Sequence, residues 1–254
     1  MFATSTLALA IVLTGCAEPE PAAGDGAVGA GETSAARELL ARSIRFHDPE
    51  GLWATRTVRL AWNGTGADGE ERVALDLTLQ PDGRTFSMSG RYRGRTIDYS
   101  IAEDRLTVTV DGSAEMPDET REAMRLLREE GMFWRGYFGF LVGLPMKLND
   151  PGTHIDPEPA DTEFMGRAVQ SIRVTYDPDV GGEIWYFYFD PETTELVGSR
   201  FYYDESANDG EYLIFEGLAE ADGLRLPMRR SWYVNADSTF LGADEVSGLT
   251  VAAG

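Results

Sequence analysis

The chain has 254 residues, of which 43% are hydrophobic and 11% aromatic, so it can bury a substantial core. The 22 Lys and Arg residues against 43 Asp and Glu residues give a formal net charge of −21, which disfavours nucleic acid and anionic lipid surfaces as partners. One Cys excludes a disulfide framework, and two His residues exclude a His-rich metal site. We expect no metal and no cofactor.

The first residues predict export. Residues 7–13 read LALAIVL, a run too short to span a bilayer but typical of a secretory signal peptide. The next segment, Leu13-Thr14-Gly15-Cys16, resembles the lipobox of bacterial lipoproteins. This resemblance implies a signal peptide over 1–15 and acylation of Cys16, with enough acyl chains for stable membrane attachment. Ala17 after the Cys favours the outer membrane by the sorting tendency of such lipoproteins, on the periplasmic side or at the cell surface.

Residues 16–33 predict a flexible tether after the lipidated Cys. The segment is rich in Pro, Ala and Gly and has no large hydrophobic residue except Val28, so it cannot bury enough apolar surface to become ordered. Residues 34–254 are then expected to form a single monomeric domain that stands off the membrane.

The start of this domain predicts one helix followed by half-exposed strands. Ser34 is placed to cap a helix that runs to about Phe46, and Asp48-Pro49-Glu50-Gly51 ends it. Alternating apolar and polar residues then predict strands over 55–62, 71–80, 95–101 and 105–110, with turns at 64–66, 81–83 and 102–104.

The middle of the chain predicts two helical segments of different character. Pro117 opens a helix to about Glu130, with acidic residues in its first turns. Residues 132–144 are apolar nearly all round, which predicts a helix buried on most sides. Gly residues and Arg135 interrupt this segment, which is also too short to cross a membrane.

The C-terminal half predicts further strands, over 163–176, 183–190, 196–203, 211–216, 224–235 and 244–251. Residues 184–189 and 212–215 are apolar on both faces, so each of these strands is covered twice or lines a cavity. The expected fold is therefore α+β: a large curved antiparallel sheet, an unclosed half-barrel, wrapped around one or two helices, with the helix around Phe140 on its concave side.

This order of elements resembles the lipoprotein localisation-factor fold, in which helices plug the mouth of an unclosed half-barrel. A closer resemblance is to a family of uncharacterised bacterial lipoproteins. Three motifs carry it over about residues 34–250: HDPxGxW, with His47, Asp48 and Trp53; GLPMKLxDPGT, over residues 143–153; and WxFYFDP, over residues 185–191. The resemblance implies the fold more than a function.

Candidate catalytic chemistry is sparse. No G-x-S-x-G elbow is present, so a serine hydrolase of that type is excluded. His47 beside Asp48 is either a general base or a helix-terminal His before an Asp-Pro turn. His154 is expected in a loop over 151–159. Residues 177–182 superficially resemble a calcium loop but fit a hairpin turn better.

Three functional hypotheses remain open. The first is a non-catalytic, membrane-anchored envelope lipoprotein that binds an apolar ligand, such as a lipid or acyl chain, in the concave face. The second is a surface module with a solid core that binds a protein or glycan. The third is a hydrolase that uses His47 and Asp48. Lys147, the only Lys, would grip an anionic head group or form a structural ion pair. The residues expected to line the ligand site are Phe133, Trp134, Tyr137, Phe138, Phe140, Met146, Lys147, Trp185 and Phe187.

Overall fold

The computed structural model describes residues 34–102, 105–126 and 132–253, and these form one antiparallel sheet with helices on its concave side. The strands follow the order β5-β4-β3-β2-β1-β13-β12-β11-β10-β9-β8-β6, and β7 also pairs with β8. The bounds are α1 Ala35–His47, β1 Arg56–Gly66, β2 Glu71–Leu79, β3 Phe86–Tyr92, β4 Arg95–Ala102, β5 Arg105–Val110, α2 Asp118–Ala123, α4 Phe133–Gly143, η1 Met146–Asn149, β6 Thr153–Ile155, β7 Ala160–Phe164, β8 Arg167–Tyr176, β9 Ile184–Phe189, β10 Leu196–Tyr202, η2 Glu205–Ala207, β11 Glu211–Ala221, β12 Leu224–Val234 and β13 Phe240–Ala253.

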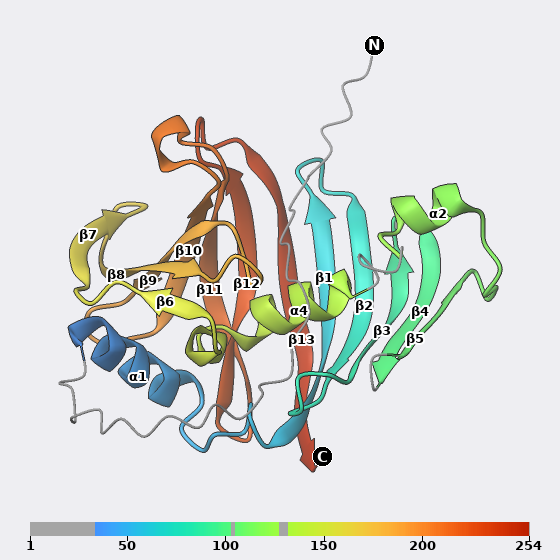
Figure 1. The fold of residues 1–254 in the computed structure, drawn as a ribbon, viewed down its shortest axis with the longest axis horizontal. Helices are drawn as coiled ribbons and strands as arrows, with labels where there is room; N and C mark the ends of the chain where they lie inside the picture. Colours follow the sequence, from blue (N-terminus) through green and yellow to red (C-terminus); the bar gives the residue numbers. More distant parts are fainter. Residues whose placement is uncertain (1–33, 103–104, 127–131, 254) are drawn as a thin grey trace.

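The two halves of the chain meet where β1 pairs with β13 along nearly its whole length. Within each half, consecutive strands mostly pair with one another, and the sheet ends at β5 on one side and at β6 and β7, which both pair with β8, on the other. This confirms the expected fold class, an unclosed half-barrel of antiparallel strands. Figure 1 shows α4 lying across the middle of the sheet, over the junction of the two halves.

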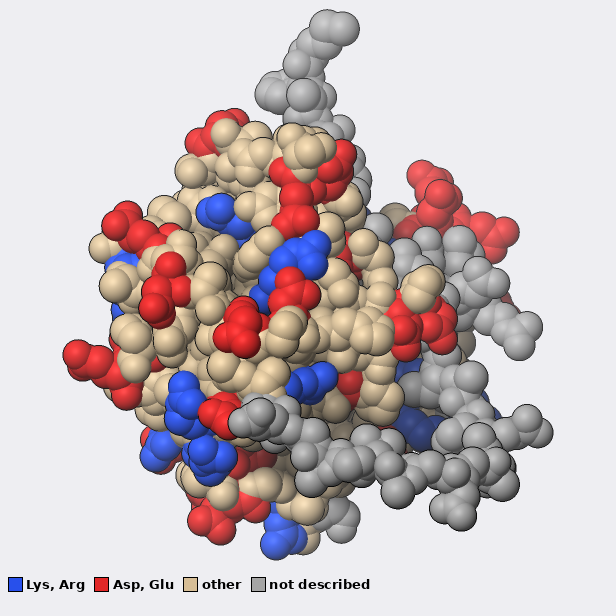
Figure 2. Space-filling view, turned by 60° about the vertical axis from the view of Figure 1, so that its left-hand side comes forward, with Lys and Arg blue, Asp and Glu red and all other residues tan. Residues whose placement is uncertain are grey.

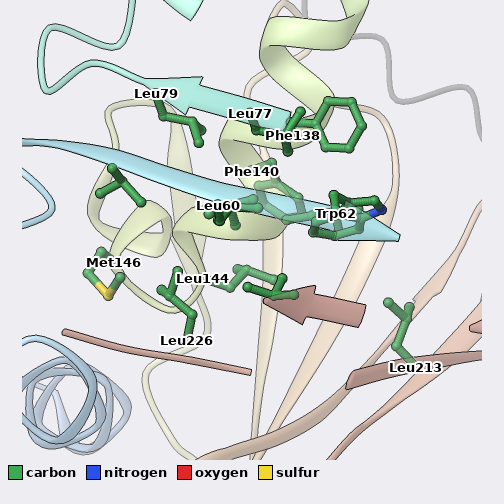
Figure 3. Close-up of a cluster of buried hydrophobic side chains, with 14 of the residues drawn as sticks. Leu60, Trp62, Leu77, Leu79, Phe138, Phe140, Leu144, Met146, Leu213 and Leu226 are labelled. Carbon is green, nitrogen blue, oxygen red and sulfur yellow. The ribbon is translucent and has the colours of Figure 1, made fainter. Parts of the chain in front are cut away.

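The main core lies between α4 and the concave face. β2 alternates strictly and β1 does so from Val58 onward, so that Leu60, Trp62, Leu75 and Leu77 point inward and are buried. Phe138 of α4 meets the ring of Trp62 edge to face, with ring centroids 5.4 Å apart. Figure 3 shows this cluster, to which the C-terminal half contributes Leu213 and Leu226.

A second, smaller core lies on the outer face of the C-terminal half. Phe164 stacks on Tyr188 with centroids 4.1 Å apart, and its ring lies so close to Gly198 that a Cβ there would meet it at 2.4 Å. Val169, Val197 and Tyr212 complete this outer cluster. It explains why the strands over 184–189 and 212–215 are apolar on both faces. Their inward residues, such as Phe187 and Leu213, pack in the main core, and on the outer face Phe164 of β7 packs on Tyr188 and Tyr212.

Several expected boundaries are wrong. β3 was not expected, because its sequence FSMSGRY contains only two large apolar residues on the inward phase before Gly90. The predicted turn at 64–66 belongs to β1, which continues to Gly66. The predicted strand 163–176 is the β7–β8 hairpin, which turns at Met165 and Gly166, both with positive φ.

The predicted helices agree more closely with the structure. α1 begins after Ser34, whose hydroxyl accepts a hydrogen bond from the backbone N–H of Arg37 at 3.3 Å. α4 matches the predicted apolar helix within one residue at each end. The helix after Pro117 is only six residues long, and the end predicted for it near Glu130 lies outside the described residues.

Candidate functional site

The predicted ligand-lining residues largely converge on one place, the concave face beneath α4. Trp134, Phe138, Phe140 and Met146 are buried in the main core. From the sheet side, Trp185 and Phe187 point into the same core, and the Phe140 ring lies edge-on to Trp185 at 5.2 Å. These residues, far apart in sequence, therefore form a continuous aromatic layer between helix and sheet.

Two predicted lining residues lie at the margin of this layer. Phe133 and Tyr137 are half-buried, and their rings stack with centroids 5.5 Å apart. Burial raises the pKa of the Tyr137 hydroxyl well above its usual value, and the nearby Asp244 carboxylate raises it further. Tyr137 therefore stands where the apolar layer meets charged groups.

Lys147 does not point into the aromatic layer as a free cation. It lies in η1 and forms an ion pair with Asp150, three residues later. Its side chain is about 29% exposed, and its Cγ lies against Gly143 at the end of α4. Of its two predicted roles, the structural ion pair is the one seen.

A buried charged cluster, which the sequence analysis did not single out, lies on the same concave face. Asp244 of β13 is opposite Gly64 on one side and Arg230 of β12 on the other. Its carboxylate accepts a hydrogen bond from Trp232 Nε1 at 2.7 Å and another from Arg72 Nη2 at 3.5 Å. A Cβ at Gly64 would meet Asp244 Oδ1 at 2.5 Å, so this glycine makes room for the carboxylate.

Arg230 is fully buried and ties α4 to the sheet. It donates to the carbonyl oxygens of Pro227 at 2.8 Å and of Leu141, in α4, at 3.1 Å, and its guanidinium lies 4.8 Å from the Trp62 ring centroid. Burial lowers the pKa of Arg230 to about 10.

Glu211 of β11 adds a further carboxyl to this cluster. Burial raises its pKa to about 7, against a partial lowering by Arg72. We call Arg72, Arg230, Asp244, Glu211 and Tyr137 the polar cluster. One signal in the sequence could have revealed it: Asp244 occupies the same strand phase as the buried Val246, and a carboxylate at a core position needs a partner.

His47 is a structural residue. Its Nδ1 lies 2.8 Å from the Arg225 carbonyl oxygen, and its Nε2 accepts the backbone N–H of Leu196 at 3.0 Å. This pattern fixes the neutral tautomer with the proton on Nδ1, and burial lowers the pKa of His47 to about 4. Neither ring nitrogen is free to act as a general base, so we do not retain the hydrolase hypothesis.

Asp48 and Trp53 join two of the sequence motifs. The Asp48 carboxylate accepts the backbone N–H groups of Leu52 at 2.7 Å and Trp53 at 3.0 Å, which fixes the turn after α1. The indole of Trp53 then covers Gly143, where a Cβ would meet Trp53 Cζ2 at 2.4 Å. The HDPxGxW and GLPMKLxDPGT motifs therefore meet at the C-terminal end of α4.

The remaining predicted residues lie elsewhere. His154 is in the short strand β6, exposed, with its Nε2 2.6 Å from Asp177. Residues 177–182 form the turn between β8 and β9, as expected. Cys16, the signal peptide and the tether lie outside the described residues. Within the described ranges, no group of three or more His, Cys, Asp or Glu side chains is placed to hold a metal ion.

The surface is strongly charged and mixed in sign. Figure 2 shows acidic side chains spread over one face of the molecule with basic ones among them.

On the outer face of β3, β4 and β5, a shallow hollow of about 250 Å³ is lined mainly by hydroxyl groups, with Asp98 among them. None of the helices in the described part of the chain is long and apolar enough to cross a membrane.

Comparison with known proteins places the chain in a family. It belongs to DUF6503, a family of unknown function whose model matches residues 28–247. This confirms membership of a family without a defined activity, while the lipoprotein character of the chain remains a prediction. A search of curated protein sequences gave no match.

The fold is shared with solved structures at low sequence identity. A LolA superfamily protein from Nitrosomonas europaea has a TM-score of 0.50 and 11% identity, and the match covers 84% of this chain and 92% of that one. A domain named for outer membrane lipoprotein sorting, from Vibrio parahaemolyticus, has a TM-score of 0.47 and 14% identity over 85% of this chain and 90% of that one. The first of these matches supports the LolA-like fold and nothing beyond it.

The contact between Trp53 and Gly143 predicts opposite effects for two glycines of α4. Gly143→Ala should lower the free energy of unfolding by about 1–3 kcal/mol, because its Cβ would collide with the indole of Trp53. Gly139→Ala, with nothing within 4 Å of the added Cβ, should raise it by about 0.5–1 kcal/mol. Urea unfolding of both variants checks this. Equal effects at the two positions would contradict the described contact.

The buried Glu211 predicts a pH-dependent gain on neutralisation. The pKa of Glu211 is about 7 in the folded chain, against 4.5 as the ordinary value. The contribution of this carboxyl to the free energy of unfolding is therefore fully present below pH 4.5 and is lost as the pH rises through 7. Glu211→Gln should therefore exceed the parent chain by about 1–3 kcal/mol at pH 8 and match it at pH 4.5. The contribution of His47 to the free energy of unfolding is lost as the pH falls from 6.5 towards 4. It is the same in both chains, so it cancels when the variant is compared with the parent.

Urea unfolding of both chains at the two pH values measures this gain. Glu216→Gln, an exposed position on the same strand, is the matched control and should change the free energy of unfolding by less than about 0.5 kcal/mol. A Glu211→Gln variant no more stable than the parent at pH 8 would show that the carboxyl is not buried as described.

Proposed function

We propose that this protein binds an apolar or amphiphilic molecule, such as a lipid acyl chain, on the concave face of its sheet, as a non-catalytic lipoprotein of the bacterial envelope. The single observation that carries the proposal is the covering of this face by α4, a short helix whose apolar residues extend nearly all the way round. Trp134, Phe138, Phe140 and Leu141 are all buried there.

The chemistry of the contact favours exchange of a helix for a ligand. The hydrophobic effect is non-directional and depends on the apolar area removed from water. An acyl chain can therefore cover the apolar concave face in the same way as the side chains of α4 do. Ligand sites are lined mainly by apolar and aromatic side chains, and the layer formed by Phe140, Trp185 and Phe187 is of this kind. Met146, in the same core, adds a flexible side chain that can adjust to ligands of varied shape. The LolA-like fold is consistent with this proposal.

A second function, protein or glycan recognition, is favoured by a different observation. The outer cluster is bordered by the half-buried Tyr186, Ile214 and Tyr233, and Arg200 lies over the Tyr212 ring at 5.1 Å. Tyr and Arg are enriched in binding surfaces. The test of the first proposal therefore needs a control variant in this outer cluster.

Uptake of a fluorescent long-chain fatty acid tests the concave site. The full chain with Cys16→Ser is the appropriate protein, because no acyl chain of its own can occupy the site. We expect binding at micromolar concentration or tighter, about −8 kcal/mol, with a change in tryptophan emission since Trp134 and Trp185 lie at the site. Mass spectrometry of the purified protein should also detect a co-purifying lipid.

Two substitutions locate the binding. Phe140→Ala should weaken fatty-acid binding by about three- to tenfold, because its ring lies on Trp185 in the aromatic layer. Phe164→Ala, in the outer cluster, should leave the affinity unchanged. Circular dichroism of both variants checks that they fold. Absence of lipid together with absence of uptake would refute the proposal, and sensitivity to Phe164→Ala alone would favour the second function.

Membrane anchoring makes a separate prediction about mass. The chain extracted from bacterial membranes should begin at Cys16 and carry three acyl chains, since the Leu13-Thr14-Gly15-Cys16 segment resembles a lipobox. Intact mass spectrometry measures this directly, with Cys16→Ser as the unmodified control. An exported chain with an unmodified thiol would refute the anchor without affecting the concave site.

A further inference from the structure

We propose that the ligand of the concave face carries one anionic head group, a carboxylate or a phosphate, and that the polar cluster binds it. This inference rests on the proposed function and deepens it, because it assigns a chemical class to the end of the ligand that is not apolar. The Arg72 and Arg230 guanidinium groups would contact the head group.

The polar cluster lies across neighbouring strands of one face. In sheet order, β2 supplies Arg72, β1 supplies Gly64, β13 supplies Asp244 and β12 supplies Arg230. Glu211 on β11 and Tyr137 on α4 lie near enough to interact electrostatically with this row. Its groups are thus set at the border of the aromatic layer, where the head of an amphiphile would lie if its chain contacted Phe138 and Trp62.

Three polar atoms of the cluster have no hydrogen-bond partner among the described residues although they are buried: Arg72 Nε, Arg230 Nε and Glu211 Oε2. Buried donors and acceptors are nearly always paired, so unpaired atoms of this kind need an explanation. Two of the three are cationic N–H donors, which favour an anionic oxygen as acceptor. The Glu211 carboxyl can also donate a hydrogen bond when it is protonated.

The charges in the cluster do not balance. Arg72 and Arg230 are two cations, whereas Asp244 is the one carboxylate in direct contact with an arginine there, at 3.5 Å from Arg72. Glu211 is only partly ionised near neutral pH. A buried positive excess is stabilised by an anion that enters with the ligand. This excess contrasts with the net charge of −21 of the whole chain, which disfavours contact with an anionic surface but not with a single inserted molecule.

The donors are held in place before any ligand arrives. The two carbonyl oxygens bound by Arg230 and the Trp62 ring beneath it fix the plane of its guanidinium. Arg72 keeps about 37% of its side chain exposed, so it is accessible from solvent. A rigid buried arginine and an accessible one together make a site that a head group can enter and that needs little reorganisation.

Three probes with the same alkyl chain separate the head group from the chain: lauric acid, lauryl phosphate and lauryl alcohol. Each displaces a bound fluorescent fatty acid from the full chain with Cys16→Ser. We expect at least one anionic probe to bind about tenfold or more tightly than the alcohol, the size of one charge-assisted hydrogen bond. The tighter of the two anionic probes identifies the head group as a carboxylate or a phosphate.

Variants then assign the preference to the cluster. Arg72→Gln should reduce the ratio of anion to alcohol affinity to less than about threefold, because it removes the accessible cation of the cluster. Arg59→Gln, an exposed arginine on the outer face of the adjacent strand, removes the same charge and should leave the ratio unchanged. Glu211→Gln should increase the ratio at pH 8, where it removes a competing negative charge, and this variant keeps the test open if Arg72→Gln fails to fold.

The outcomes distinguish the two levels of the proposal. Equal binding of alcohol and anions overturns the head-group site but leaves the apolar site standing. The same holds if the preference survives in Arg72→Gln or if Glu211→Gln does not increase it. If none of the three probes binds, the proposed function itself fails, and this inference fails with it.

Discussion

An open antiparallel sheet with an apolar concave face must cover that face, and α4 does so here. Strands of both halves present large side chains on this face, among them Trp62 and Phe187. Burial of each such side chain contributes about 1.5–3 kcal/mol, so the contact between helix and sheet is a large part of the stability of the fold. The position of α4 therefore determines both what the core is and what space a ligand could take.

A few specific contacts keep α4 in its position. Arg230 binds the Leu141 carbonyl, Trp134 Nε1 donates to the Met124 carbonyl at 3.1 Å, and Trp53 covers Gly143. The conspicuous sequence motifs serve these joints: Asp48 fixes the turn that holds Trp53, and His47 connects α1 to β10 and β12. Residues that look catalytic in the sequence thus turn out to align the helices over the sheet.

The elements predicted correctly from the sequence are those with a clear local periodicity of apolar residues. Strict alternation in β2 and the all-round apolar character of α4 are strong signals, and both elements were found. Weaker patterns gave wrong predictions where a tertiary contact determines the local structure. Gly64 was predicted to lie in a turn, but it lies within β1, where the absence of a side chain makes room for Asp244. The polar cluster was missed because its members come from four strands and one helix, and only the pairing of β1 with β13 brings them together.

The location of a bound ligand is the central claim, and photolabelling tests it most directly. A fatty acid with a diazirine at the end of its chain, irradiated with the protein and mapped by peptide mass spectrometry, reports the residues it touches. We predict adducts on α4 and on inward residues of the sheet such as Trp62 and Leu213. Adducts confined to Phe164, Tyr188 and Tyr212 on the outer face would contradict the account.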